Sequence, residues 1–282
     1  MFFLKNHETV ASGGKISTIS RKPKIGLVLG GGAARGWAHV GVIKALEAAG
    51  IRPDLVCGTS VGALVGVVYA AGELDKFEQW LMDMNMRNIF SLLDLRLKGG
   101  MLKGEKLIEF FRQHFVDRSV EELGMPYGAV ATCLHTGMEV WLRSGSAIHA
   151  MRASIAFPGL FTPVRHEQRF LVDGGLVNPV PVSLARAMGA EFVIAVDLNT
   201  DLLEPWAYAD KETLSVREVL SNSINIMQLR IARARLAGDP ADVMITPKVG
   251  HVGFFDFHRG VEAIAVGEKS VSSVLPSLQS LL

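Results

Sequence analysis

A serine enclosed by glycines is the clearest chemical motif in this sequence. Gly58-Thr59-Ser60-Val61-Gly62 lies between a short apolar run, Leu55-Val56-Cys57, and a stretch of small residues typical of a helix. A strand that turns sharply into a helix through Gly-x-Ser-x-Gly forms a nucleophile elbow, which exposes the serine oxygen at the end of the strand. The N-terminus of the following helix favours developing negative charge. The alternative is a serine that only caps that helix.

Asp173 is the candidate general base for this serine. It follows a strand-like run at 169–172, and Gly174 and Gly175 behind it permit close approach of the backbone. A solvated aspartate is too weak a base to take a serine proton, so the assignment requires a shielded carboxylate. A simple Asp-Gly turn is the alternative.

A third glycine-marked turn, Gly30-Gly31-Gly32, also follows an apolar run. It is not a P-loop, because Gly36 is followed by Trp37, and Arg35 occupies the place of the third glycine in the dinucleotide-binding fingerprint. Consecutive unhindered N–H groups instead predict an oxyanion hole. Arg35 is interpreted either as a solvated surface residue or as a charge that orders the loop or meets an anionic substrate group.

The remaining pattern indicates strands alternating with helices, which is typical of a parallel sheet with right-handed crossovers. Loops at the carboxyl ends of parallel strands converge, so the three turns are expected to meet in one crevice. Predicted strands are 24–29, 54–57, 127–134, 138–142 (a hairpin with the preceding run), 169–172, 191–197 and 242–245. Predicted helices are 33–49, 61–71, 147–156, 181–188 and 214–236, with an interrupted amphipathic stretch at 74–116.

Composition favours an ordinary globular chain with an ample core: it has 282 residues, of which 49% are apolar and 20% are charged. We expect residues 1–22 to form a loosely attached tail and 23–282 a single domain. The net charge of +1 gives no indication of nucleic-acid binding. Cys57 and Cys133 are interpreted as reduced core thiols of a cytoplasmic protein. No run of 18 apolar residues predicts a membrane-spanning helix, although peripheral contact with a membrane surface stays open.

A Ser-Asp-His triad is the main alternative to a dyad, with His251 or His258 as its third member. Ser60 follows only two predicted strands, whereas α/β-hydrolases place the nucleophile after several, and no motif supports either histidine. A dyad is therefore favoured. The other histidines of the folded region lack metal-ligand spacing and are interpreted as structural: His39, His114, His135, His149 and His166.

The three glycine-marked motifs, in this order and spacing, resemble the patatin-like phospholipases, and most closely the bacterial branch related to the catalytic domain of neuropathy target esterase. The segment from Arg152 to Phe161 also matches, and the similarity covers about residues 24–200. The family's glycine motif usually reads Gly-Gly-Gly-x-Arg-Gly, and this chain has Ala33 at the third glycine. If that position needs a positive φ, alanine there costs about 1 kcal/mol or more.

The resemblance implies a three-layer α/β/α fold with a mostly parallel central sheet, and a Ser60–Asp173 dyad that works through an acyl-enzyme. It implies an oxyanion hole at Gly31, Gly32 and Ala33, with Arg35, Gly58, Gly62 and Gly174 in supporting positions. It implies no metal and no cofactor. The expected substrates are lysophospholipids, phospholipids or simple acyl esters.

Two further questions concern the methionine-rich stretch and whether the protein is an enzyme. Met82, Met84, Met86 and Met101 lie in the 74–101 stretch, which is expected either to fill the core or to form an adaptable wall for acyl chains. A regulatory or adaptor protein that keeps the fold with little turnover is the alternative to an enzyme. The sequence does not indicate an oligomeric state.

Overall fold

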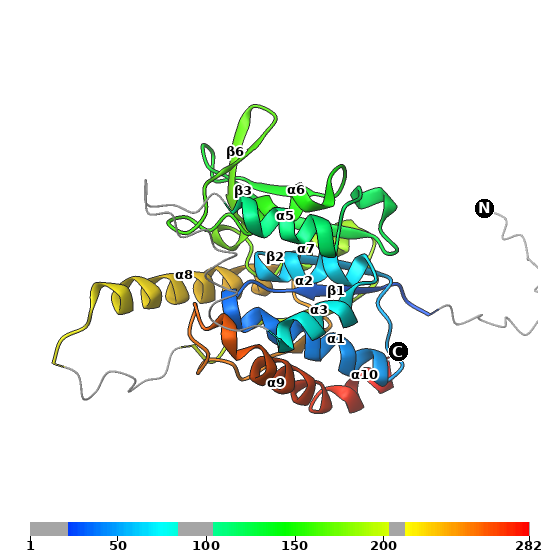
Figure 1. Cartoon of the computed structure of the whole chain (residues 1–282). Coiled ribbons are helices and arrows are strands. Elements are labelled where there is room, and N and C mark those ends of the chain that lie inside the picture. Colours follow the sequence, from blue (N-terminus) through cyan, green and yellow to red (C-terminus); the bar gives the residue numbers. More distant parts are fainter. Residues whose placement is uncertain (1–21, 84–103, 203–211, 282) are drawn as a thin grey trace, which may run out of the picture.

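The computed structural model describes residues 22–83, 104–202 and 212–281 (Figure 1). The expected tail at 1–22 lies outside the described residues except for Lys22. Met84, Met86 and Met101 of the methionine-rich stretch also lie outside them.

A central sheet of eight strands organises the chain, in the order β5-β6-β3-β2-β1-β7-β8, with β4 paired to β3. Five strands run parallel to one another: β1 (Ile25–Leu29), β2 (Leu55–Thr59), β3 (Tyr127–Cys133), β7 (Phe192–Val196) and β8 (Val243–Ile245). Three pair antiparallel: β4 (Glu139–Leu142), β5 (Val164–His166) and β6 (Arg169–Asp173). The mostly parallel sheet predicted from the sequence is confirmed.

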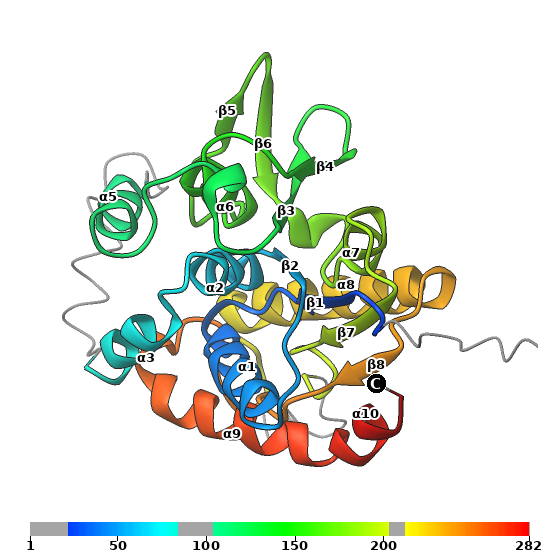
Figure 2. The same ribbon diagram turned by 90° about the vertical axis from the view of Figure 1, so that its right-hand side faces the viewer.

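Helices cover both faces of this sheet (Figure 2). One face carries α1 (Ala38–Ala48), α2 (Val61–Ala70), α3 (Leu74–Met82), α5 (Glu105–His114), α6 (Ala147–Ser154) and α9 (Gly260–Ser272). The other face carries α7 (Val182–Ala187) and α8 (Val216–Gly238). The chain closes with α10 (Leu275–Leu281), and short 3-10 turns lie at Ala33–Trp37 (η1), Val120–Glu122 (η2), Gly174–Leu176 (η3) and Phe257–Arg259 (η4).

The three layers follow from alternation along the buried strands. Leu27 and Leu29 of β1 belong to the apolar core beneath α1 and α2, whereas Val28 between them packs with α7. Successive side chains of a strand point to opposite faces, so an uninterrupted apolar strand such as β1 requires cover on both sides.

Three elements differ from the sequence prediction. The strand predicted at 169–172 is present as β6, but it runs antiparallel to β3 and forms a hairpin with β5. His166, which we placed in a polar loop, belongs to β5. That strand has three residues, Val164-Arg165-His166, too few for the alternation of apolar and polar side chains to be recognised. The helix predicted to begin at Ala33 begins as η1 and becomes α-helical at Ala38.

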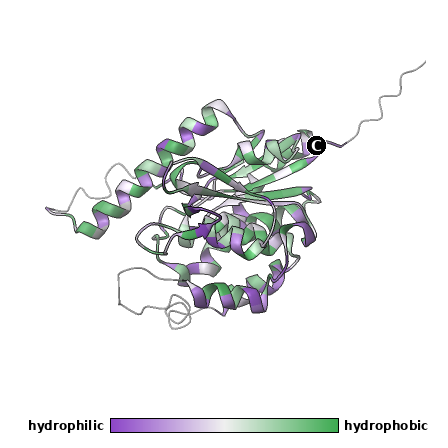
Figure 3. Ribbon diagram, turned by 90° about the horizontal axis from the view of Figure 1, so that it is seen from above, coloured by the Kyte–Doolittle hydropathy of each residue, from purple (hydrophilic) through white to green (hydrophobic). Residues whose placement is uncertain are grey.

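The long helix α8 extends away from the sheet, as the view from above shows (Figure 3). Its exposed apolar side chains are Val216, Val219, Leu220, Ile226 and Met227. Within the described ranges, no helix is both long enough and apolar enough to cross a bilayer.

Candidate active site

Ser60 and Asp173 form a direct hydrogen-bonded pair. The Ser60 hydroxyl donates to Oδ2 of Asp173 at 2.6 Å, although 113 residues separate the two in sequence. Such a short bond to a carboxylate is typical of a charge-assisted interaction. A hydroxyl that already donates to a carboxylate is arranged to lose its proton to that group when it attacks an electrophile.

The sheet register explains why these distant residues meet. Thr59, the last residue of β2, pairs with Val130 of β3, and Asp173, the last residue of β6, pairs with the next residue, Ala131. Both of these β3 residues pair with β4 on their other edge. Therefore β2 and β6 occupy the same edge of β3 and meet end to end. We expected Asp173 at the carboxyl end of a parallel strand, but it reaches the site from the opposite direction.

Close backbone packing makes the elbow around Ser60 depend on glycine. A Cβ at Gly58 would collide with the backbone of Gly62, and a Cβ at Gly62 would collide with the carbonyl of Leu29. Ser60 itself has φ 56° and ψ −126°, a conformation that L-residues rarely adopt. The strained turn projects the serine from the end of β2, at the N-terminus of α2.

Ser154, the last residue of α6, holds this elbow. Its hydroxyl accepts the backbone N–H of Ser60 at 2.9 Å and donates to the carbonyl of Val130 at 2.6 Å. Ser154 is fully buried. It therefore links the nucleophile's backbone to the strand that also positions Asp173.

Asp173 is held in a shielded position, as a basic carboxylate requires. Its side chain is buried, and Oδ1 accepts the N–H of Gly175 at 2.7 Å. The Thr132 hydroxyl donates to its backbone carbonyl at 2.8 Å. Burial raises the pKa of Asp173 to about 6, against the opposing effect of the hydrogen bonds from Ser60 and Gly175. The carboxylate is thus a stronger base than a solvated aspartate and is ionised at neutral pH.

The glycine turn contributes two residues to the pocket that contains Ser60. The N–H of Gly31 donates to the carbonyl of Pro179 at 2.9 Å and is already engaged. Gly32 and Ala33 line the same pocket as Ser60, and no described backbone carbonyl accepts their N–H groups. Ala33 has φ 49°, the left-handed conformation that the family's usual glycine would adopt without strain.

Arg35 is buried, with 2% of its surface exposed, so the interpretation as a solvated residue is wrong. Its Nε donates to the carbonyl of Gly32 at 3.0 Å, and Nη2 donates to Asn225 of α8 at 3.4 Å. Burial lowers its pKa to about 10, while the charges of Asp201 and Asp197 favour the cation. Arg35 therefore holds the glycine turn through its hydrogen bond to the carbonyl of Gly32.

No histidine in the described ranges hydrogen-bonds to Ser60 or Asp173. Nε2 of His251 lies 2.8 Å from Glu262, and neither it nor His258 hydrogen-bonds to Ser60 or Asp173. His39 is buried with its ring 2.8 Å from the carbonyl of Gly30, and burial lowers its pKa to about 4, so it is neutral. Among the described residues, the Ser60–Asp173 pair stands without an imidazole partner.

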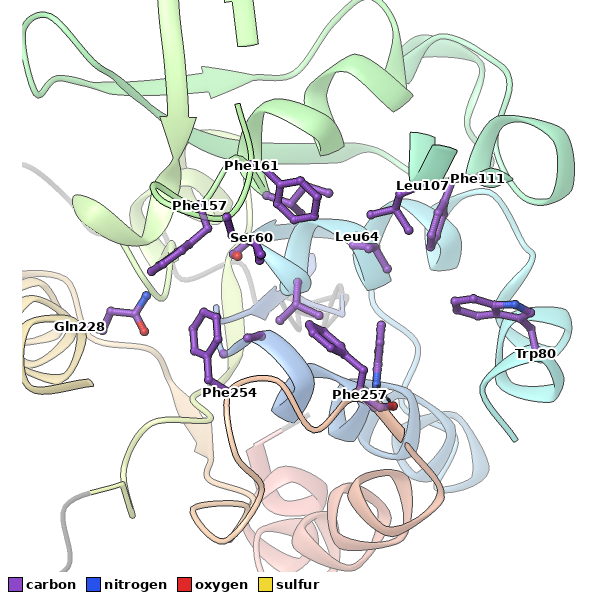
Figure 4. A pocket seen from close by; sticks show the side chains of 16 residues that line it. Ser60, Leu64, Trp80, Leu107, Phe111, Phe157, Phe161, Gln228, Phe254 and Phe257 are labelled. Atoms are coloured by element: carbon purple, nitrogen blue, oxygen red, sulfur yellow. Dashed lines mark hydrogen bonds between the residues drawn. The ribbon is translucent and has the colours of Figure 1, made fainter. Parts of the chain in front are cut away.

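An apolar pocket opens onto Ser60 (Figure 4). Its side chains come from the turns and helices around the dyad, and Gln228 of α8 is the polar exception besides Ser60. Trp80 of α3 contributes to the wall, whereas Met82 is 52% exposed and does not line it. The lining residues are Gly32, Ala33, Trp37, Ser60, Val61, Leu64, Trp80, Leu107, Phe111, Ile155, Phe157, Leu160, Phe161, Gln228, Phe254 and Phe257.

Comparison with family models matches residues 27–186 to the patatin-like phospholipases. This chain belongs to the patatin-like phospholipase family. The matched region contains Ser60, Asp173 and the glycine turn, and family membership supports a lipid acyl hydrolase.

Similar proteins extend the match over most of the chain. An NTE family protein of Mycobacterium tuberculosis is 31% identical over 336 aligned residues, which cover 92% of this chain and 93% of that protein. The human patatin-like phospholipase domain-containing protein 6 is 36% identical over 184 residues, covering 62% of this chain and 13% of that larger protein. VipD from Legionella pneumophila has a similar fold, with a TM-score of 0.52 and 16% identity over 91% of this chain and 67% of VipD.

The structure adds two residues of the candidate site that sequence reasoning missed. Ser154 lies in a segment that we matched to the family without giving it a role, because its contact with Ser60 depends on the fold. Gln228 lies beyond residue 186, where the family model ends. Neither Ser154 nor Gln228 belongs to a sequence motif that indicates its role.

Proposed function

We propose that this protein is a serine acyl hydrolase in which Ser60 is the nucleophile and Asp173 the general base. The observation that carries the proposal is the 2.6 Å hydrogen bond from the Ser60 hydroxyl to the buried carboxylate of Asp173, at the edge of an apolar pocket. The oxyanion hole and the substrate class are parts of the same proposal.

In the first half of the reaction, the Ser60 oxygen attacks the ester carbonyl carbon while its proton passes to Asp173. The N–H groups of Gly32 and Ala33 are the donors we assign to the oxyanion, because the N–H of Gly31 is engaged with Pro179. Collapse of the intermediate expels the alcohol, which takes the proton from Asp173. The acyl group stays on Ser60.

In the second half, water attacks the acyl carbon and gives a proton to Asp173. The bond between the carbon and the Ser60 oxygen then breaks, the serine recovers the proton, and the carboxylic acid leaves. This scheme requires neither a histidine nor a metal ion. Lysophospholipids, phospholipids and simple acyl esters are the proposed substrates, and the apolar pocket supports an acyl chain bound beside Ser60.

A transient contact with a membrane surface stays a prediction. The exposed apolar side chains of α8 support it, because the same helix carries Gln228, which lines the pocket that opens onto Ser60.

The test is hydrolysis of a lysophospholipid and of a short p-nitrophenyl ester by wild type, Ser60→Ala and Asp173→Asn. We expect both variants to lose at least about a thousandfold in kcat/KM on both substrates. Ser146→Ala, at the opposite end of α6 from Ser154, is the control and is expected to retain activity. Turnover that persists in Ser60→Ala would contradict the proposal and favour a regulatory protein with contaminating activity.

A further inference from the structure

Gln228 is a buried polar residue that the scheme above does not use. It lies on α8 with 5% of its surface exposed, and it lines the pocket that opens onto Ser60. Its Oε1 is buried without a hydrogen-bond partner among the described residues. A buried amide oxygen has lost its hydrogen bonds to bulk water, and buried polar side chains normally bond to the protein or to an ordered water molecule.

The amide of Gln228 lies close to the proposed base. Figure 4 shows its side chain directed from α8 toward the pocket, beside Phe157 and Phe254. Its Nε2 lies 2.9 Å, and Oδ1 of Asp173 lies 3.0 Å, from the position that a Cβ on Gly175 would occupy. Nε2 of Gln228 and Oδ1 of Asp173 are therefore no more than about 6 Å apart. The unpartnered Oε1 belongs to the same amide group, so one water molecule can bridge this amide and the Asp173 carboxylate.

The other side chains of the pocket offer few hydrogen-bond partners for a water molecule. Apart from Ser60 and Gln228, its lining side chains are apolar or absent, as at Gly32. A bound water needs two or more polar partners, and an apolar cavity stays dry. Deacylation nevertheless requires a water molecule at the acyl carbon, after the acyl group has occupied the Ser60 oxygen.

We propose that Gln228 is a positioning residue that holds the hydrolytic water against Asp173 during deacylation. The water donates one hydrogen to the Asp173 carboxylate and the other to Oε1 of Gln228, which leaves a lone pair directed at the acyl carbon. Attack forms the bond between water oxygen and carbon, the proton passes to Asp173, and cleavage at the Ser60 oxygen returns that proton to the serine. The inference rests on the proposed function.

The test separates the two halves of the reaction by stopped-flow kinetics with p-nitrophenyl butyrate. In Gln228→Met, which preserves length without an amide, we expect acylation within about threefold of wild type and deacylation slowed about tenfold or more. The acyl-enzyme then accumulates, and a burst of p-nitrophenol approaching one equivalent per Ser60 precedes slow turnover. Gln113→Met, the same exchange at an exposed position of α5, is the matched control and should resemble wild type.

Two results would overturn the inference. Acylation and deacylation that fall in parallel in Gln228→Met would indicate a general packing role, and unchanged deacylation would exclude any role. Gln228→Leu provides a second apolar replacement, and the rate of fluorophosphonate labelling reports whether the Ser60 site is intact in each variant. If wild type shows no Ser60-dependent acylation, the proposed function fails. If wild type is acylated but Gln228→Met shows no burst, only the inference about Gln228 fails.

Discussion

The hydroxyl of Ser154 lies 2.9 Å from the backbone nitrogen of Ser60 and accepts its N–H. The same hydroxyl donates to Val130, the β3 residue that pairs with Thr59. The nucleophile's strained backbone is thereby fixed to the strand that also pairs with Asp173. Precise placement of a nucleophile depends on such support, because small displacements of reacting groups cost large factors in rate.

Replacement of Ser154 by alanine is expected to lower both stability and activity. It leaves the Ser60 N–H and the Val130 carbonyl without their partner in the core, which costs about 1–3 kcal/mol in the free energy of unfolding. We expect kcat/KM to fall about tenfold or more because the elbow shifts. Urea unfolding and ester hydrolysis measure the two effects.

Ser146→Ala controls for the loss of stability alone. Ser146 caps the start of the same helix by accepting the N–H of His149, so its removal costs about 1 kcal/mol. It lies at the far end of α6 from Ser60, and activity should stay near wild type. Equal loss of activity in the two variants would contradict a specific role for Ser154.

The pH dependence of hydrolysis should report Asp173. The base must be ionised to accept the serine proton, and burial raises its pKa to about 6. We therefore expect kcat/KM to rise with pH through about 6 and to level off above about pH 7, with about a tenfold loss at pH 5. A profile that stays flat down to pH 4.5 would show that Asp173 is not the titrating base.

Asp173→Asn is expected to stabilise the protein at alkaline pH while it abolishes turnover. Folding raises the pKa of this carboxyl above its ordinary value of 3.8, so its contribution to stability is present below about pH 4 and is lost as pH rises through about 6. A neutral amide avoids that loss. At pH 8 we expect a gain of about 1–3 kcal/mol in the free energy of unfolding.

Urea unfolding at pH 8 and at pH 4 measures this gain, which should shrink at the lower pH. Ser60→Ala serves as the comparison, because it removes the same hydrogen bond and keeps the carboxylate. If Asp173→Asn is less stable than wild type at pH 8, the claim that the buried Asp173 charge destabilises the fold is contradicted.

Ala33→Gly should stabilise the glycine turn. Ala33 has φ 49°, which costs an L-residue about 1–2 kcal/mol, and glycine removes that strain while it adds some unfolded-state entropy. We expect a net gain of about 0.5–1 kcal/mol, seen as a higher Tm, with hydrolysis retained. Ala34→Gly, at a buried residue without positive φ, should instead lower Tm. A loss of stability in Ala33→Gly would contradict strain at this position.

Much of the fold could be predicted because long apolar strands and glycine-marked turns are strong local signals. The strands now seen as β1 and β7 are apolar throughout, and β2 is apolar from Leu55 to Cys57. The hairpin of β3 and β4 follows from two runs separated by His135-Thr136-Gly137. The three-residue β5 gave no such signal. The reversed direction of β6 is a property of pairing between distant segments, which periodicity does not encode.

The residues of the candidate site also fall into two groups, those that sequence motifs indicate and those whose position depends on the tertiary fold. Ser60 and Asp173 stand in glycine motifs, so their types and neighbours suggested their chemistry before the structure placed them 2.6 Å apart. The buried position of Arg35 could not be predicted, because one of its hydrogen-bond partners is Asn225, 190 residues away in sequence on α8. Gln228 belongs to that same helix, and its position beside Asp173 depends on how α8 packs against η3.

The central claim is that Asp173 activates Ser60 without help from a histidine. The most direct measurement is the rate of fluorophosphonate labelling of wild type, Ser60→Ala, Asp173→Asn and the double variant His251→Ala/His258→Ala, read by intact mass. We predict single labelling of wild type and of the histidine variant at similar rates, no labelling of Ser60→Ala and strongly slowed labelling of Asp173→Asn. Labelling that survives in Ser60→Ala, or that is lost when the two histidines are removed, would contradict the dyad.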